Sequence, residues 1–477
     1  MSYRIKDTDL HNQAQQFQAT TNSLRHARRE RVLNMHRNII DIPECKGYAS
    51  SEEIETIITG VLQLNPTAPS QLFQLIDNDP VVTKLIRTHN VLPSLKKILL
   101  NSQVDVMLSV LDCFINYCYE SPECSYEVME LNDMVPVCVS LLQLDNKELN
   151  DKTLWLLCNT VSDVFNVKTK IISTQLFKLI PLLAHKYQDQ LVPRLSWLCL
   201  VLSEIQANGP PLPEELFSVL FSFALEFLDK YKTVPEIASD CLYTFVHLSV
   251  QFEYLNYFQN PSLLDLIKSF FLSPETTLFV PAMRFFGNLI IADEAVEYVL
   301  NYIGDTFLTS IKSTNAQMLK EVYFFYSNLA ATKSLPVIMK CVNGEQVDVA
   351  VNFILQRSVF QDTRLEMEHF IVNLFVSSFV EIKAILLSKP RILEALLKVC
   401  RDTEAPLKLL WSSLKAIGLV CEYGENVARV DYTNLFEELK VVDTLDEIIN
   451  TINNNKITNL ARQLRDNYFM VEGYDQL

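Results

Sequence analysis

The chain has 477 residues, of which 49% are hydrophobic and 21% are charged, so it can bury a large core. Only 9 residues are glycine, which leaves little room for β-rich turns or phosphate-binding glycine loops, and the net charge of −16 disfavours nucleic acid as a partner. No uninterrupted apolar run of about 18 residues is present, so we expect no membrane span and no membrane partner.

The amino-terminal segment is basic, whereas the rest of the chain is acidic. Residues 1–40 contain seven Lys or Arg and three acidic residues, a net charge of +4, which leaves −20 for the remainder because the whole chain carries −16. The stretch 23–40 predicts a helix with Ser23 as its N-cap. A linker with Pro43 and Gly47 follows. We therefore expect a basic arm over 1–44, a folded body over 52–470 and a short tail over 471–477.

From residue 52 onward, a helical unit repeats along the body. Each unit has a short first helix, an apolar second helix entered through a turn, and a third helix that carries a recurring polar position. The turn and second helix recur, for example, as NVLPSLKKILL from residue 90, DMVPVCVSLL from residue 133 and SLPVIMKCV from residue 334. Apolar residues at helical spacing, with proline between the segments, predict an all-α fold.

The recurring position is an asparagine in five of the eight third helices in which we identify it. The eight positions are Asn116, Asn159, Val201, His247, Asn288, Asn328, Asn373 and Gly418. Their successive separations are 43, 42, 46, 41, 40, 45 and 45 residues. A period in this range is typical of stacked helical units, which place equivalent residues along one face. We therefore predict an α-solenoid of roughly ten units whose face binds an extended partner.

An aromatic residue often stands four positions before the recurring one. Trp155 precedes Asn159 in this way, and Phe324 precedes Asn328. This spacing puts both side chains on one helical face, where asparagine can bond a peptide backbone and the ring can hold a lysine or arginine side chain. The alternative interpretation is that both residues pack helices together, with the asparagine bonded to an adjacent loop.

Enzymatic signals are absent from the sequence. It contains no GxSxG, HExxH, P-loop or GxGxxG motif, and its histidines and cysteines lack the spacing of metal ligands. Its 11 cysteines form no CxxC pair and stand in apolar helical stretches, which favours reduced core thiols. We therefore expect a binding protein without enzymatic activity or cofactor.

Four stretches of the chain carry a family resemblance: LSWLCLVLSEIQANGPPLP (195–213), PAMRFFGNLI (281–290), SLRHARRERVLNMHRNI (23–39) and the last repeats and closing helices over 413–469. Together they resemble the importin-α (karyopherin-α) family of armadillo-repeat nuclear import adaptors. The resemblance implies a right-handed α-solenoid of armadillo repeats that works in cytoplasm and nucleus. It would bind basic nuclear localisation signals of cargo proteins in a concave groove and link them to importin-β.

The resemblance also implies site residues. A major peptide-binding groove would consist of Asn116, Ser121, Trp155, Asn159, Asp163 and Trp197, and a minor one of Arg284, Asn288, Phe324, Asn328, Glu366 and Asn373. Asp163 falls where the family places the carboxylate that pairs with the critical lysine of the signal. The importin-β-binding helix would use Arg25, Arg28, Arg29, Arg31 and Arg37. A nuclear export receptor would bind the last repeats.

The sequence departs from the family pattern at several of these positions. Asp112 replaces the first aromatic residue of the major groove, Val201 replaces its third asparagine, and His369 replaces an aromatic residue of the minor groove. The arm lacks the usual upstream arginine run, and the basic cluster with which the family's arm inhibits itself is reduced here to Met35, His36, Arg37 and Asn38. The resemblance is therefore weakest for importin-β binding and for self-inhibition. These departures predict a weakened or redirected cargo site. They also motivate a second hypothesis, a diverged armadillo scaffold that binds a dedicated protein and has lost signal recognition.

Overall fold

The computed structural model describes residues 50–76, 80–131, 134–204, 210–304, 315–356, 360–377, 379–402 and 405–469. These residues form helices with no β-strand among them, which confirms the predicted all-α class. The five arginines of the basic arm and the tail over 471–477 lie outside the described residues. In the part of the chain that is described, no helix is both long enough and apolar enough to cross a lipid bilayer.

The chain divides into two compact units, whose described parts are residues 50–251 and 252–469. We call them the N-terminal unit and the C-terminal unit. The α-helices of the N-terminal unit are α2 (Ser51–Leu62), α3 (Ala68–Ile76), α4 (Pro80–Thr88), α5 (Leu92–Asn101), α6 (Val104–Glu120), α7 (Pro122–Met129), α8 (Met134–Leu142), α9 (Lys147–Asp163), α10 (Phe165–Ser173), α11 (Leu179–Tyr187), α12 (Val192–Ser203), α13 (Glu214–Lys230) and α14 (Pro235–Ser249), with short helices η1 (Leu176–Lys178) and η2 (Gln188–Gln190).

The C-terminal unit continues the same helical pattern. Its helices are η3 (Phe252–Phe258), α15 (Pro261–Lys268), η4 (Ser269–Leu272), α16 (Thr276–Leu289), α17 (Asp293–Ile303), α19 (Ala316–Ala330), α20 (Leu335–Val342), α21 (Gln346–Leu355), α22 (Gln361–Val376), α23 (Val380–Leu387), α24 (Ile392–Cys400), α25 (Leu407–Tyr423), η5 (Gly424–Ala428), α26 (Tyr432–Glu438), α27 (Val441–Thr451), α28 (Asn455–Leu464) and η6 (Arg465–Phe469).

Local sequence explains where many of these helices begin. Ser50 caps α2 through a reciprocal pair of hydrogen bonds with Glu53, in which each side chain accepts from the other residue's backbone N–H. Proline stands in the first turn of α5, α7, α12, α14, α15 and α20, where its missing N–H leaves no intrahelical bond unmade. Serine and proline at these positions therefore favour the starts of individual helices, within the repeated units as well as between them.

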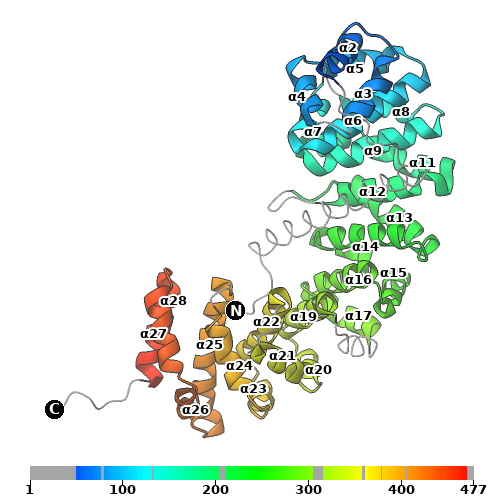
Figure 1. Cartoon of the computed structure of the whole chain (residues 1–477). Helices are drawn as coiled ribbons and strands as arrows, with labels where there is room; N and C mark the ends of the chain where they lie inside the picture. The colour runs from blue at the N-terminus through cyan, green and yellow to red at the C-terminus, as the bar shows by residue number, and fades with distance from the viewer. Residues whose placement is uncertain are drawn as a thin grey trace. The chain divides into compact units, whose positions relative to one another are not determined.

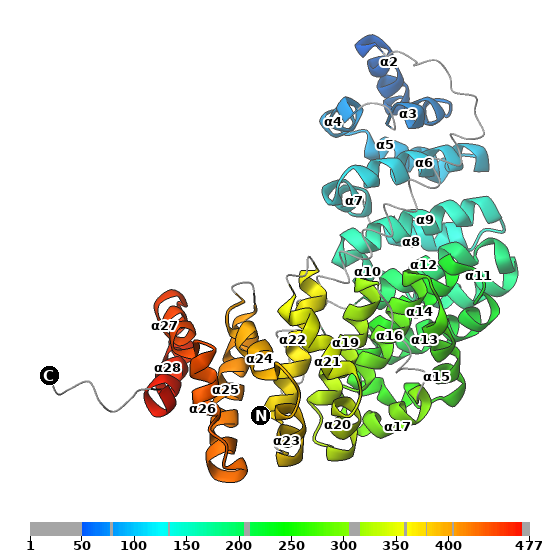
Figure 2. The ribbon, with the colours of Figure 1, turned by 60° about the horizontal axis from the view of Figure 1, so that its bottom comes forward.

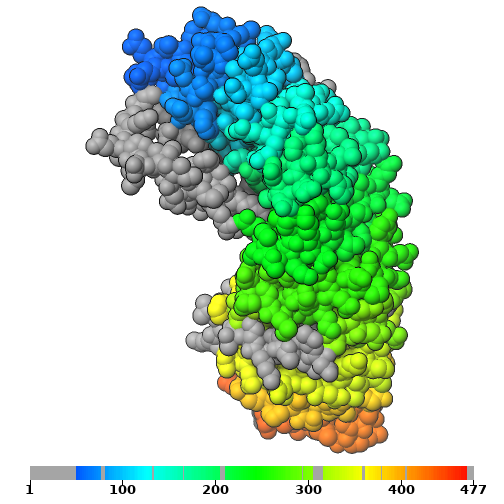
Figure 3. Space-filling model, turned by 90° about the vertical axis from the view of Figure 1, so that its right-hand side faces the viewer, coloured from blue at the N-terminus to red at the C-terminus, as the bar shows by residue number. Residues whose placement is uncertain are grey.

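All eight recurring positions fall on helices that lie side by side within their unit. In the N-terminal unit these third helices are α6, α9, α12 and α14, each in contact with the next (Figure 1). In the C-terminal unit they are α16, α19, α22 and α25, again in sequence order (Figure 2). The colour order within each unit in the space-filling view follows the sequence in the same way (Figure 3). This arrangement is compatible with an α-solenoid, in which each repeat packs against its neighbours in sequence.

Apolar side chains of the second and third helices form the core. Large rings such as Phe114 and Phe217 are fully buried in the N-terminal unit, and Phe285 and Phe370 are fully buried in the C-terminal unit. The ten cysteines among the described residues are also buried, and none of them forms a disulfide. They act as small apolar residues of the core.

Candidate functional site

The side chain of Arg194 covers the first tryptophan of the predicted major groove, Trp155. Trp155 lies on α9 and Trp197 on α12, and Arg194 in the first turn of α12 reaches between these helices. Its guanidinium carbon is 4.1 Å from the ring centroid of Trp155 and 5.9 Å from that of Trp197. Its Nε also donates to Asp151 Oδ1 at 3.2 Å. We call these four residues, together with Asn159, the tryptophan site.

A second internal cation lies one repeat earlier. Lys152 on α9 pairs with Asp112 on α6, with 2.5 Å between Nζ and Oδ1. Asp112 stands four residues before Asn116, as Trp155 stands four residues before Asn159, so Lys152 faces a carboxylate at the position where Arg194 faces a ring. Both cations stand seven residues before the recurring position of their own helix. The third helices of the N-terminal unit are thus joined by side chains that cross from one repeat to the next.

The polar side chains predicted for the major groove differ in their burial and in their hydrogen-bond partners. The Nδ2 atom of Asn116 is buried without a hydrogen-bond partner among the described residues. The side chain of Asn159 is buried. Asp163 ends α9, where its Oδ2 accepts from Ser125 Oγ of α7 at 2.6 Å. Asn116 therefore has an amide hydrogen without an acceptor among the described residues.

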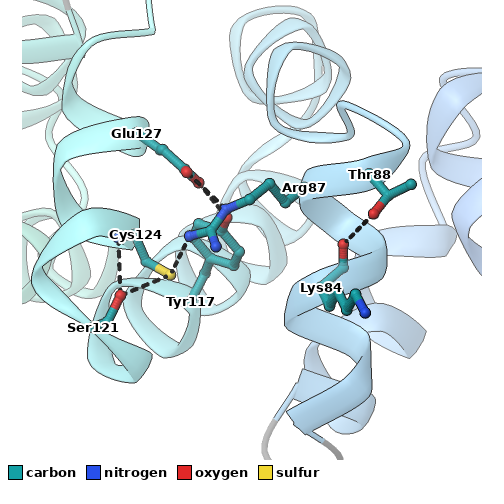
Figure 4. Close-up of polar contacts among 7 residues, drawn as sticks. All are labelled: Lys84, Arg87, Thr88, Tyr117, Ser121, Cys124 and Glu127. Carbon is teal, nitrogen blue, oxygen red and sulfur yellow. Dashed lines mark hydrogen bonds and ion pairs between the residues drawn. The ribbon is translucent and has the colours of Figure 1, made fainter.

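Ser121 takes part in a polar network that joins three helices (Figure 4). Its Oγ caps α7 by accepting from the backbone N–H of Cys124 at 3.4 Å. Close by, Arg87 of α4 pairs with Glu127 at 2.7 Å, and the Tyr117 hydroxyl of α6 donates to the same carboxylate at 2.5 Å. Burial and this hydrogen bond raise the pKa of Tyr117. Ser121 therefore fixes the start of α7 within a network that orders this end of the unit.

An arginine also covers an aromatic ring in the C-terminal unit. Arg284 on α16 donates through Nε and Nη2 to the two carboxylate oxygens of Glu321 on α19, at 2.5 and 2.7 Å. Its guanidinium carbon is 4.0 Å from the ring centroid of Phe324. Only 8% of the Arg284 side chain and 5% of the Glu321 side chain are exposed, so the pair is buried. We call Arg284, Glu321, Phe324 and Asn328 the arginine site.

Asparagines of the C-terminal unit bond the preceding third helix. Asn328 Nδ2 donates to the backbone oxygen of Gly287 at 3.1 Å, and Asn373 Nδ2 donates to that of Ser327 at 3.0 Å. Each acceptor is the residue just before the recurring position of its helix, Asn288 or Asn328. These bonds agree with the packing interpretation of the asparagines, with a helix in place of the adjacent loop.

Glu366, the last predicted residue of the minor groove, lies on α22 beside the arginine site. It is half-buried, and burial raises its pKa to about 7, although the charge of Arg284 opposes the shift. The nearby Glu321 carboxylate raises it further. Of the predicted minor set, the structure thus brings Arg284, Phe324 and Glu366 close together.

Sequence reasoning missed the residues that complete both sites. Arg194 and Glu321 stand seven residues before their recurring positions, as do Lys152 and Glu366. This spacing places all four two turns along the helix from the recurring position, on the same face. Glu366 is among the residues predicted for the minor groove, and a search for charged residues in the same register would also have found Arg194, Lys152 and Glu321. Such a search would not have shown that each charge reaches into the neighbouring repeat.

Comparison with known proteins adds support for the fold alone. No protein-family profile matches the sequence, and no curated protein matches it. Among the solved structures that match, one is titled an engineered protein and has a TM-score of 0.71 at 14% identity, over 87% of this chain and 98% of that chain. At this identity the likeness supports the helical architecture and says nothing about a ligand.

Proposed function

We propose that this chain is an armadillo-repeat adaptor of the importin-α type, with roughly ten repeats, which holds basic, extended segments of other proteins along its third helices. The observation that carries the proposal is the guanidinium of Arg194 on the face of Trp155, 4.1 Å from the ring centroid. A basic segment presents the same chemical group. The tryptophan site therefore has the geometry and the carboxylate needed to hold an arginine or lysine.

The chemistry of the N-terminal unit fits such a ligand. Cation–π contact with a tryptophan contributes about 0.5–2 kcal/mol, depending on desolvation. Asp151 adds a carboxylate beside the ring. The buried Nδ2 of Asn116 has no acceptor among the described residues, so a rotation of this side chain towards a ligand carbonyl would satisfy it. Together these groups would hold both the side chain and the backbone of an extended basic segment.

A second candidate function is a diverged armadillo scaffold that binds a dedicated protein partner. The arginine site favours it for the C-terminal unit, because Arg284 is paired with Glu321 and the amides of Asn328 and Asn373 bond a neighbouring helix. These groups hold the repeats together and are already engaged. Under the adaptor proposal, the N-terminal unit therefore does most of the cargo binding.

The proposal includes the partners that the resemblance implies. Cargo bound in the cytoplasm would pass to the nucleus with importin-β held by the basic arm over 1–44, and a nuclear export receptor would bind the last repeats within 413–469. Basic residues of the arm and acidic residues of the body, with net charges of +4 over 1–40 and −20 elsewhere, suit these roles.

Fluorescence anisotropy of a labelled basic localisation peptide with the full chain tests the adaptor function. We expect binding that Trp155→Ala weakens at least tenfold, a loss of about 1.4 kcal/mol. Trp411→Ala is the matched control, because Trp411 lies on α25 of the other unit and its removal should leave the affinity unchanged. Binding no tighter than that of a scrambled peptide of equal charge would overturn the adaptor in favour of the scaffold.

A further inference from the structure

The side chain of Arg194 is partly exposed to solvent in the tryptophan site. About 17% of its side chain is exposed, and 34% of that of its partner Asp151. It donates to Asp151 through Nε at 3.2 Å, whereas Arg284 in the other unit makes a bidentate pair at 2.5 and 2.7 Å. The contacts of Arg194 are therefore weaker and more accessible than those of Arg284.

The position of Arg194 in its helix also weakens its hold. It is the third residue of α12, directly after Pro193. The first turn of a helix carries a partial positive charge from unpaired backbone N–H groups, which disfavours a cation there by about 0.3–1 kcal/mol. A rotation of the Arg194 side chain into solvent would relieve this repulsion without any change in the backbone of α12.

Arg194 and a ligand cation cannot both occupy this site. A lysine or arginine that stacks on the α12-facing side of Trp155 must use the same ring face and the same Asp151 carboxylate. Two cations about 4 Å apart repel each other by about 4 kcal/mol at an effective dielectric constant of 20. Entry of a ligand cation therefore requires the departure of Arg194.

We propose that Arg194 is a resident cation of the tryptophan site and the residue that determines which ligands enter it. This inference rests on the proposed function. A single ligand cation would only replace the contacts that Arg194 already makes, so the ligand must be a segment with several basic residues, whose other contacts supply the binding energy. The apparent affinity is the intrinsic affinity multiplied by the fraction of molecules in which Arg194 has left. A substitution that removes its charge should raise the affinity.

The test compares two variants of the full chain that differ in the charge at this position. Arg194→Gln can still bond Asp151 but carries no charge, whereas Arg194→Lys keeps the charge. With a labelled peptide that carries a basic cluster, we expect Arg194→Gln to bind at least tenfold more tightly than the wild type and Arg194→Lys to bind like it. Equal or weaker binding by Arg194→Gln would overturn the inference while leaving the adaptor function in place.

A second readout does not depend on the peptide. In a Trp411→Phe background, Trp155 and Trp197 are the remaining two of the three tryptophans, and acrylamide quenching reports their exposure. Removal of Arg194 should increase the quenching. If neither the wild type nor Arg194→Gln binds the peptide but quenching is higher in Arg194→Gln, the proposed function is wrong, whereas the inference that Arg194 covers the tryptophan site is supported. If neither binds and quenching is unchanged, both proposals are wrong.

Discussion

Two arginines cover aromatic rings of third helices, and their surroundings predict different roles. Arg284 is 8% exposed in its side chain and bonded to both oxygens of Glu321. The side chain of Arg194 is 17% exposed and donates a hydrogen bond through Nε to Asp151. A buried bidentate pair is costly to break, whereas a single hydrogen bond between partly exposed side chains costs less to break. We therefore assign Arg284 to stability and Arg194 to ligand exchange.

Removing one partner of the buried pair should destabilise the C-terminal unit. Glu321→Ala leaves the Arg284 guanidinium in a buried position without its carboxylate, and such changes cost about 3–5 kcal/mol. The exposed pair of Arg391 and Glu394 offers a matched control, because Glu394→Ala should cost about 1 kcal/mol or less. Thermal unfolding followed by circular dichroism measures both. Equal shifts of the melting temperature would contradict the structural role of Arg284.

Glu368 should make the stability of the C-terminal unit depend on pH. Its side chain is 1% exposed, and its Oε2 has no hydrogen-bond partner among the described residues. Burial raises its pKa from 4.5 to about 8; the charge of Asp402 adds to this shift, while Arg364 and Lys398 oppose it. The folded state thus binds a proton that the unfolded state releases between pH 4.5 and 8, so stability falls as pH rises through this window.

Glu368→Gln should remove that fall. We expect the variant to be more stable than the wild type at pH 8, by roughly 2–4 kcal/mol, and to differ little from it at pH 5. Glu447→Gln, at an exposed position on α27, is the control and should leave the pH dependence unchanged. Melting temperatures measured from pH 5 to pH 8 decide the matter. Parallel curves of melting temperature against pH for Glu368→Gln and the wild type would show that Glu368 does not cause the pH dependence.

At the scale of elements, the contact of α16 with α19 depends on a glycine. Gly287 has no side chain where the Phe324 ring lies, and a Cβ there would come within 2.7 Å of two ring carbons. The ring is buried, with Arg284 on it at 4.0 Å. The close approach also brings Asn328 within bonding distance of the Gly287 carbonyl. The absence of a side chain at Gly287 thus lets the arginine site form.

Gly287→Ala should therefore destabilise the unit, although alanine favours a helix over glycine by about 1 kcal/mol. Overpacking of a filled core costs about 1–3 kcal/mol, so we expect a net loss. Phe324→Leu should make room for the new methyl group, so the two substitutions together should cost less than their sum. Unfolding experiments on the single and double variants measure this coupling. If the free-energy changes of the two single variants add up to that of the double variant, the Phe324 ring and residue 287 are not in steric conflict.

The repeat period predicted the elements better than it predicted their contacts. Spacings of 40–46 residues placed all eight recurring positions on helices, and Trp155 and Trp197 lie on neighbouring helices as the period predicts. The period defines a face, but it does not say which side chain of the next repeat reaches that face. Arg194 on Trp155 and Asn328 on Gly287 depend on rotamers and on the distance between helices, which no single repeat encodes.

At the scale of the whole molecule, charge should govern how a basic partner approaches. Residues 41–477 carry a net charge of −20, which attracts basic segments over the range of the Debye length. Raising the salt concentration shortens that length from about 10 Å at 0.1 M to about 3 Å at 1 M. Peptide binding should weaken at least tenfold over this range, as measured by anisotropy at each salt concentration. An affinity independent of salt would indicate an apolar partner and argue against a basic one.

The central claim is that a basic segment lies against α9 and α12, and photo-crosslinking tests it most directly. A basic peptide with a photoreactive group beside its central lysine would be irradiated with the full chain, and the labelled residues would be identified by mass spectrometry. We predict labels on Lys147–Asp163 and Val192–Ser203 that unlabelled peptide removes and Trp155→Ala reduces. Labels concentrated in the C-terminal unit, or labels that unlabelled peptide does not remove, would contradict the account.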